Sequence, residues 1–180
     1  MVATSIRKGF NSLALFYNKD LFDIAGVEYP ADDDTWMEFE EKMAAVADFS
    51  EEFEGLAIAA DFARMGAFSY ATGWQDFDDQ GNTNLLDDRF VQSFEWYTGL
   101  EKEGHAILPA DMGADWAGGA FANGNVAAAI EGAWVIGFLR DQAPNLNYGA
   151  VKIPVYPGTD ERGNFIFTVS WSMNAESDVK

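Results

Sequence analysis

Glu131 and Trp134 are the residues of this sequence whose types and spacing could most directly do chemistry. The apolar run Val126–Ile130 suits a buried strand, Gly132 breaks it, and Trp134 stands at the turn into the next helix. A carboxylate there could serve a glycoside-cleaving pair if a second carboxylate stood opposite. The spacing indicates no such partner, so a hydrogen bond to a ligand, or simple solvation of the strand end, is the better interpretation of Glu131.

Other motifs for catalysis, phosphate binding or metal binding are weak. His105 is the single histidine and follows a helix stop at Gly104, which is more typical of a surface loop than of a general base. Gly113–Gly124 holds four glycines without the Gly-x-Gly-x-x-Gly order of a phosphate-binding loop. We therefore expect no cofactor and no metal. A loose calcium-loop spacing fits a surface turn better, and it involves Asp76, Asp78, Gln80, Gly81, Asn82 and Asp87.

The tryptophans form two groups. Trp36 and Trp96 lie on predicted helices, where core packing is the better interpretation. The others lie at predicted element ends or on the last strand: Trp74, Trp116, Trp134 and Trp171. Aromatic faces at such places can stack on the apolar C–H faces of sugar rings, while nearby amides and carboxylates bind the hydroxyls. As a group, these residues indicate a carbohydrate-type site.

Composition and charge exclude several classes of partner. The 180 residues predict one domain, and 48% of them are hydrophobic, which is enough for a core. The net charge of −19 argues against nucleic-acid binding, whose footprint is a basic patch, and against docking on anionic lipids. No apolar run is long enough to span a membrane. The absence of cysteine excludes disulfides and thiolate metal sites.

Hydrophobic periodicity and capping residues predict the elements that position these side chains. Asn18 and Gly26 bound a short helix, and Thr35 with Glu38 forms a capping box. The predicted strands are Leu13–Tyr17, Gly55–Ala59, Val126–Ile130, Tyr148–Val155 and Ile166–Met173. The predicted helices are Lys19–Ala25, Thr35–Ala47, one within Asp61–Gly73, one capped by Asp88 and stopped by Gly104, one capped by Asp115 and ending at Ala122, and Ala133–Gln142.

Strands that alternate with helices predict an α/β fold, with a largely parallel sheet flanked by helices. In such sheets, ligands bind beyond the carboxyl ends of the strands. Trp134 stands at one of these ends.

Four segments carry a family resemblance. They are Leu13–Phe22 (LALFYNKDLF), Thr35–Phe39 (TWMEF), Phe121–Trp134 (FANGNVAAAIEGAW) and Tyr148–Gly158. The first resembles an LxxYNKDLF signature, the second a TWDEL helix start, and the third an F-x-x-G-K-A-A-M-x-x-x-G-x-W motif. These motifs resemble those of the extracellular solute-binding proteins of sugar ABC transporters, the maltose-binding-protein-like group. Asn125 stands where this group commonly has Lys.

The resemblance implies a periplasmic-binding-protein-like type II fold with two lobes. Residues 1–180 resemble the C-terminal lobe alone, with hinge crossings at residues 1–12 and 165–175. The partners implied are the N-terminal lobe of the same protein, a membrane permease and a small sugar. A periplasmic or extracellular location is implied too, although Met1 to Asn11 lacks the apolar region of a signal peptide.

Site residues follow from the resemblance by position. Trp134 matches the family's stacking aromatic, and Asn11 falls where a polar contact to the ligand lies at the first crossing. Arg64 and Met65 fall near the loop that reaches the ligand. Trp171 falls at the return crossing, and Glu131 and Trp116 are further candidates.

The function expected is therefore binding, not catalysis: uptake of a neutral sugar or oligosaccharide through an interlobe cleft. One alternative is a glycoside-acting enzyme that uses Glu131. Others are binding of a non-sugar solute such as a polyamine, and a protein-interaction lobe without a small ligand. An apolar face that includes Trp134 and Trp171 is expected toward the other lobe, where a homodimer could form.

Overall fold

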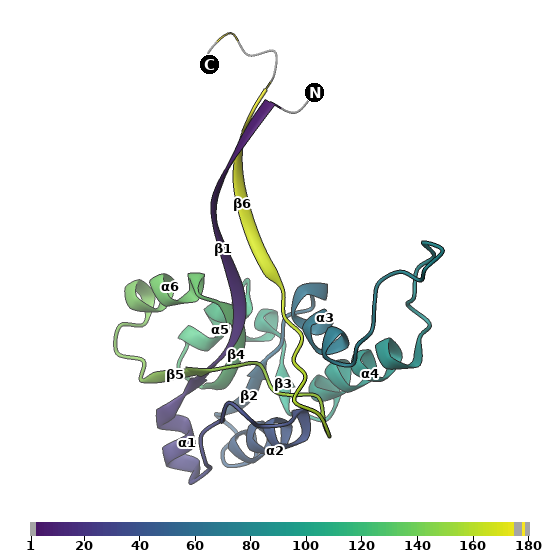
Figure 1. The fold of residues 1–180 in the computed structure, drawn as a ribbon. Coiled ribbons are helices and arrows are strands. Elements are labelled where there is room, and N and C mark those ends of the chain that lie inside the picture. The colour runs from purple at the N-terminus through teal and green to yellow at the C-terminus, as the bar shows by residue number, and fades with distance from the viewer. Residues whose placement is uncertain (1–2, 175–177, 179–180) are drawn as a thin grey trace.

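The computed structural model describes residues 3–174 and 178, and it places a mixed sheet between two layers of helices (Figure 1). The predicted α/β class is confirmed. None of the helices within these residues is long and apolar enough to cross a membrane. The strands are β1 (Ala3–Asn18), β2 (Glu54–Ala57), β3 (Ala106–Ile107), β4 (Val126–Gly132), β5 (Tyr148–Val151) and β6 (Ile166–Met173). The helices are α1 (Lys19–Ala25), α2 (Trp36–Ala47), α3 (Phe62–Ala71), α4 (Asp88–Lys102), α5 (Ala117–Ala122) and α6 (Trp134–Gln142), with a 3₁₀ turn at Pro109–Met112.

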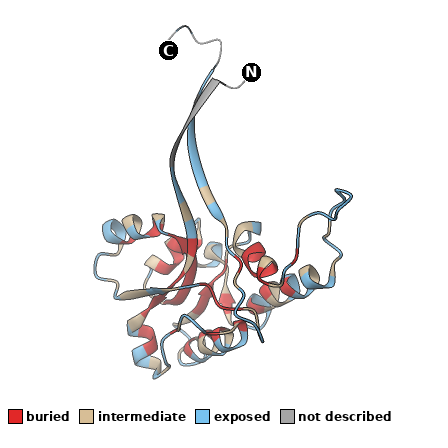
Figure 2. Ribbon diagram, in the orientation of Figure 1, coloured by how far each residue is buried: buried red, intermediate tan, exposed pale blue. Residues whose placement is uncertain are grey.

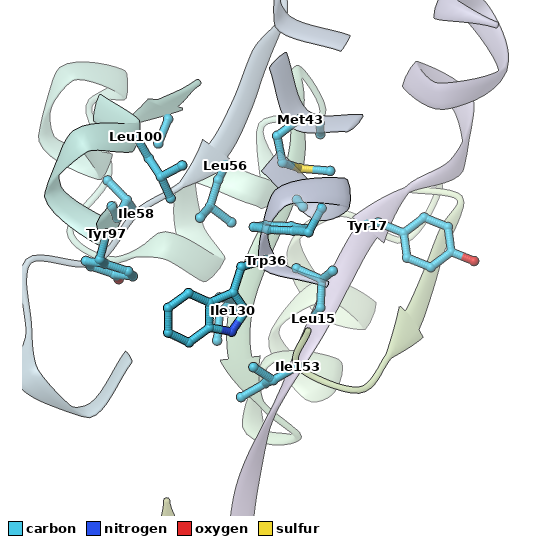
Figure 3. Close-up of a cluster of buried hydrophobic side chains, with 14 of the residues drawn as sticks. Leu15, Tyr17, Trp36, Met43, Leu56, Ile58, Tyr97, Leu100, Ile130 and Ile153 are labelled. Atoms are coloured by element: carbon cyan, nitrogen blue, oxygen red, sulfur yellow. The ribbon is translucent and has the colours of Figure 1, made fainter. Parts of the chain in front are cut away.

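Side-chain alternation along the strands separates two apolar cores, one on each face of the sheet. On β1, Leu15 and Tyr17 pack toward α1, α2, α3 and α4, whereas Phe16 packs toward α5 and α6. The larger core surrounds Trp36, which Figure 3 shows close to Leu15 and Ile130. Trp36 stacks on Trp96 with ring centres 4.8 Å apart, which confirms the core role predicted for both.

The strand order is β3-β2-β4-β1-β5, and the strands do not all run the same way. β2 is parallel to β3 and β4, but β1 is antiparallel to β4, β5 and β6. The prediction of a largely parallel sheet is therefore wrong for β1. A crossover helix fixes the relative direction only of the strands that it joins. β4 and β5, which α6 connects, do run the same way, but β1 lies between them.

Local capping chemistry sets two helix starts as predicted. The Asn18 side chain accepts a hydrogen bond from the N–H of Asp20 to begin α1, and Gly26 ends that helix at a φ of 68°. Thr35 and Glu38 form both hydrogen bonds of the capping box of α2.

Two predicted caps are wrong by one position or more. Asp87, not Asp88, caps α4, and hydrogen bonds from Arg89 lower the pKa of the Asp87 carboxyl to about 2. Two neighbouring aspartates can each serve as a cap, so the sequence does not distinguish them. Asp115 does not cap α5, because the helix begins at Ala117 and Trp116 takes the cap position without a side-chain hydrogen bond.

Two strand predictions also change. The expected strand Tyr148–Val155 is β5 only as far as Val151. Pro154 lacks an N–H for a ladder, and Val155 instead forms an isolated bridge with Thr35. The two-residue strand β3 was not predicted, since so short a run carries no periodicity.

Residues 3–12 of β1 and all of β6 form a two-stranded ribbon, here called the arm. Figure 1 shows the arm projecting from the body of the fold. Figure 2 shows that the buried residues gather in the body. The arm instead exposes large apolar side chains: Phe10, Ile166, Val169 and Trp171.

Candidate ligand-binding site

The parallel strands β3, β2 and β4 bring their carboxyl ends to one edge of the sheet. The loops that leave these ends surround a hollow of about 550 Å³, here called the strand-end hollow. Its volume lies within the range of small-molecule sites. Alanines line much of it, which leaves space, and its charged or aromatic lining residues are Asp61, Arg64, Asp115, Trp116 and Glu131.

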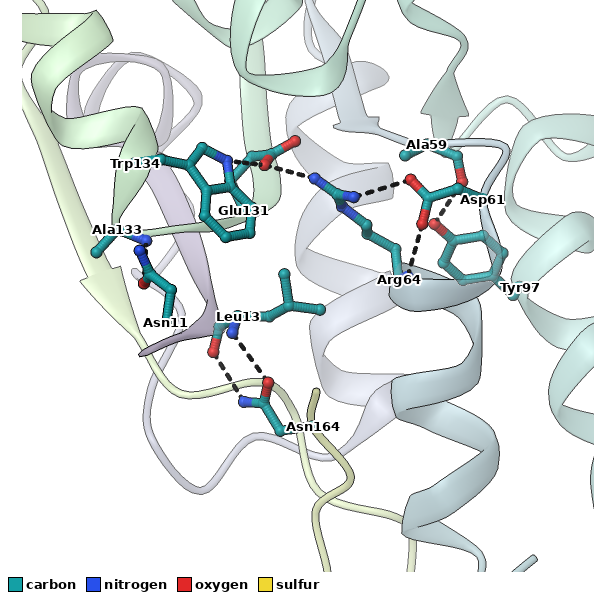
Figure 4. A network of polar contacts seen from close by, with 10 residues as sticks. All are labelled: Asn11, Leu13, Ala59, Asp61, Arg64, Tyr97, Glu131, Ala133, Trp134 and Asn164. Atoms are coloured by element: carbon teal, nitrogen blue, oxygen red, sulfur yellow. Dashed lines mark hydrogen bonds and ion pairs between the residues drawn. The ribbon is translucent and has the colours of Figure 1, made fainter. Parts of the chain in front are cut away.

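A network of charged side chains forms part of the wall of this hollow (Figure 4). Glu131, at the end of β4, is fully buried. Its Oε2 accepts hydrogen bonds from Arg64 Nη2 at 2.6 Å and from Trp134 Nε1 at 2.8 Å. Arg64 also donates to Asp61 Oδ2 at 2.9 Å, and Asp61 caps α3. Because an unpaired buried charge costs about 3–5 kcal/mol, this network holds its members in place.

Close packing fixes the indole of Trp134. A Cβ on Gly132 would lie 2.3 Å from a ring atom of Trp134, so only glycine leaves room for the ring. Phe167 of β6 meets the indole edge-on, with ring centres 5.0 Å apart and an interplanar angle of 86°. The guanidinium carbon of Arg64 lies 5.8 Å from the ring centre, within cation–π range. Trp134 is thus rigid yet only half-buried.

A second hollow, of about 490 Å³, lies at the base of the arm and is here called the arm hollow. Its lining residues are Gly9, Phe10, Asn11, Trp134, Phe167 and Val169. Asn11 Oδ1 accepts a hydrogen bond from the N–H of Ala133 at 3.0 Å, which ties the arm to the start of α6. The Glu131–Trp134 hydrogen bond links the walls of the two hollows.

Trp116 provides a second aromatic wall. A Cβ on Gly118 would lie 2.4 Å from its ring, so this indole also packs on a glycine. Phe138 of α6 meets the ring at 70° with centres 5.0 Å apart. Trp116 therefore stands fixed at the strand-end hollow.

The structure brings most of the predicted site residues to these two hollows. Arg64, Glu131 and Trp116 line the strand-end hollow, and Asn11 and Trp134 line the arm hollow. Their contact with a ligand stays a prediction.

Met65 and Trp171 lie elsewhere. Met65 is 7% exposed and lines, with Phe62 and Phe94, another hollow that shares residues 59–61 with the strand-end hollow. Trp171 lies on the arm opposite Ile6, is 70% exposed, and lines neither of the two hollows.

Sequence reasoning missed Asp61 and Phe167. Asp61 precedes α3 and stands three residues before Arg64, a spacing typical of a capping residue that also pairs with an arginine. The period of two puts Phe167 on the same face of β6 as Val169 and Trp171, which are exposed, so the sequence carries no signal that sets Phe167 apart. Trp74 was a candidate aromatic, but it is 2% exposed and donates its Nε1–H to the Asn84 carbonyl.

The arrangement suits binding better than acid–base chemistry. Asp61 is the other carboxylate of the Glu131 network, and Arg64 bonds to both of them. Tyr97 donates its hydroxyl to the Ala59 carbonyl, and burial raises the pKa of Tyr97 well above its ordinary value, so it remains protonated. Oε2 of Glu131 is therefore held by Arg64 and Trp134.

Two polar groups away from the hollows have structural roles. Asp78 accepts hydrogen bonds from the N–H groups of Gln80 and Asn82, so the calcium-like segment forms the surface turn that was expected. His105 Nδ1 lies 2.9 Å from Glu40 Oε1, and the other oxygen of Glu40 accepts a hydrogen bond from Trp96.

Comparison with known proteins identifies the family. Residues 7–179 match the family model described as bacterial extracellular solute-binding protein. The chain belongs to this family. The resemblance seen in the sequence is thereby confirmed, and membership of this extracellular solute-binding family implies a periplasmic or extracellular location.

A curated relative and several solved structures match almost the whole of this chain. A Brucella abortus chain described as a binding protein is 25% identical over 172 residues, which cover 93% of this chain and 41% of that one. The ABC substrate-binding protein of Listeria monocytogenes solved with cycloalternan is 23% identical, with a TM-score of 0.79 over 97% of this chain and 44% of that chain. The cyclo/maltodextrin-binding protein solved with maltotetraose is 28% identical, with a TM-score of 0.67 over 92% and 42%.

This solute-binding protein chain therefore spans less than half the length of the relatives that it matches. The solved structure from Agrobacterium vitis S4 with bound D-mannitol shows the same proportion, with a TM-score of 0.80, 20% identity, and coverage of 97% of this chain and 43% of that one.

Proposed function

We propose that this chain is the C-terminal lobe of the substrate-binding component of an ABC importer, and that it contributes half of a cleft that binds a neutral sugar or oligosaccharide. The observation that carries the proposal is the indole of Trp134, which a glycine, a buried carboxylate and Phe167 hold beside two hollows. A rigid, half-exposed aromatic face beside hydrogen-bonding groups is what a sugar ring requires.

Charge supports a neutral solute over an anionic one. Asp61, Asp115 and Glu131 face the strand-end hollow, and Arg64 is already paired with two of these carboxylates. The chain as a whole carries −19. The solved relatives with cycloalternan, D-mannitol and maltotetraose support the same class of solute.

The arm supports the proposed hinge. In this proposal residues 1–12 and 165–175 cross to an N-terminal lobe, and Asn11 and Trp171 lie on these crossings. The exposed apolar side chains of the arm would then pack against that lobe. A membrane permease is the further partner of such an importer component.

A cationic solute such as a polyamine is the second candidate, and the excess of carboxylates in the strand-end hollow favours it. Aromatic side chains can bind an ammonium group by cation–π attraction. A neutral sugar remains the better proposal, because Arg64 already approaches Trp134 at 5.8 Å and a second cation there would be repelled.

A thermal-shift screen with sugars, polyols, amino acids and polyamines tests the proposal. A ligand present at ten times its Kd stabilises the folded state by about 1.4 kcal/mol. We expect stabilisation by a sugar or polyol and its loss in Trp134→Ala. Stabilisation by a polyamine with no response to any sugar would contradict the assigned class.

A further inference from the structure

We propose that Glu131 determines which solutes this lobe accepts. Its side chain presents a buried hydrogen-bond acceptor to the strand-end hollow, and this acceptor selects polyhydroxylated over carboxylated solutes. This inference rests on the proposed function, since it names the chemistry by which the same site chooses its solute.

The two oxygens of Glu131 have different surroundings. Oε2 accepts both internal hydrogen bonds, from Arg64 and from Trp134. Oε1 is buried and accepts no hydrogen bond from the residues that the structure describes. In Figure 4 no dashed line reaches this second oxygen, and Glu131 is a lining residue of the strand-end hollow. Buried acceptors normally have a partner, so a donor that enters this hollow would satisfy Oε1.

Arg64 adds a second requirement. Its Nε is a buried donor that likewise has no acceptor among the described residues, although two carboxylates already balance its charge. A hydroxyl group both donates and accepts hydrogen bonds. The hydroxyls of one sugar or polyol can therefore serve Glu131 and Arg64 together. An ammonium could serve only Glu131, and a carboxylate could serve only Arg64 while meeting Asp61 and Asp115 at the same hollow.

Glu131→Gln tests this role with little change of shape. The amide oxygen can replace Oε2 and keep the hydrogen bonds from Trp134 and Arg64. The amide nitrogen then replaces Oε1, which turns the unpartnered acceptor into a donor. We expect this variant to bind neutral sugars or polyols about tenfold more weakly, since a neutral hydrogen bond to the hydroxyl replaces one to a charged group. The ligand-free indole N–H signal of Trp134 should be nearly unchanged.

The measurement is a titration of the 180-residue chain with ¹⁵N-labelled tryptophan, followed through the indole N–H signals. The probes are glucose, mannitol, glucosamine and glucuronate. Glu28→Gln, the same change at an exposed position in the loop after α1, is the matched control and should bind as the unaltered chain does. In the unaltered chain, glucose or mannitol should bind more tightly than glucuronate, a comparison that needs no variant.

Each outcome decides the inference. Equal sugar binding by Glu131→Gln and the unaltered chain, or glucuronate binding as tightly as glucose, would overturn it and leave the proposed function standing. A response to glucosamine alone would overturn the choice of hydroxyl groups. If no probe shifts any indole signal, the proposed function fails as well.

Discussion

The indole of Trp134 depends on a neighbour that has no side chain. Gly132 is not in the left-handed region of backbone conformation, so its role is steric: the benzo ring of Trp134 occupies the space that a Cβ would need. The hydrogen bond from the indole to Glu131 requires that close approach. Residues 131, 132 and 134 therefore act as one unit.

This predicts opposite results for the same substitution at two glycines that are five positions apart in the chain. Gly132→Ala should displace the indole, break its hydrogen bond to Glu131, and destabilise the fold by roughly 1–3 kcal/mol, as overpacking does. Gly137→Ala is the matched control in α6, because its Cβ would meet nothing within 4 Å. It should be neutral or stabilising by up to about 1 kcal/mol. Urea unfolding and the indole signal of Trp134 measure both effects, and equal behaviour of the two variants would contradict the packing argument.

For single residues, the sequence predicts position on a strand or helix better than it predicts contacts between distant residues. The placement of Trp134 at the end of a strand followed from Gly132 and the apolar run before it. The Arg64–Glu131 pair did not, because the two residues are 67 positions apart and on different elements. Met65 shows that neighbours in the chain can point to different places. It follows Arg64 directly, but a helix turns successive side chains by about 100°, so Met65 points into the core.

Elements with local signals are the ones that the sequence predicts well. Asn18, Gly26 and the Thr35–Glu38 box set helix ends through hydrogen bonds within a few residues. The direction of β1 is not local, because it depends on pairing with β4 more than 100 positions away. Alternation of strands and helices could not reveal it.

The arm is the part of the fold that exposes large apolar side chains with the least support from packing. A two-stranded ribbon is marginally stable alone, and this one exposes Phe10 and Trp171 at 78% and 70%. We expect the 180-residue chain to self-associate through the arm, and we expect Phe10→Ser with Trp171→Ser to reduce that association.

Size-exclusion chromatography with light scattering measures this association over a range of concentrations. Ile24→Ser is the matched control, since Ile24 is also an exposed apolar residue, at 56%, but lies on α1 in the body of the fold. Loss of association in the Ile24 variant, or none at any concentration in the unaltered chain, would contradict the role of the arm.

At the scale of the whole molecule, three features support the proposal that this chain is one lobe of a larger binding protein. They are the two hollows, the arm and the share of its relatives' length that the chain matches. The chain covers less than half of its relatives, and its strand-end and arm hollows are open. In the proposed importer, closure of a second lobe supplies the remaining contacts with the solute. A single lobe leaves the solute half solvated, so the 180-residue chain should bind sugar weakly, with a Kd on the order of 1 mM or above.

The most direct test of the central claim is a titration of the ¹⁵N-tryptophan-labelled chain with a panel of neutral sugars. The account predicts that the indole signals of Trp134 and Trp116 shift and saturate in the millimolar range. The signals of Trp36, Trp74 and Trp96, which lie in the packed interior or are tied by internal contacts, should stay in place. Calorimetric binding in the micromolar range would contradict the shared cleft, and the absence of any shift at Trp134 and Trp116 would contradict sugar binding at this site.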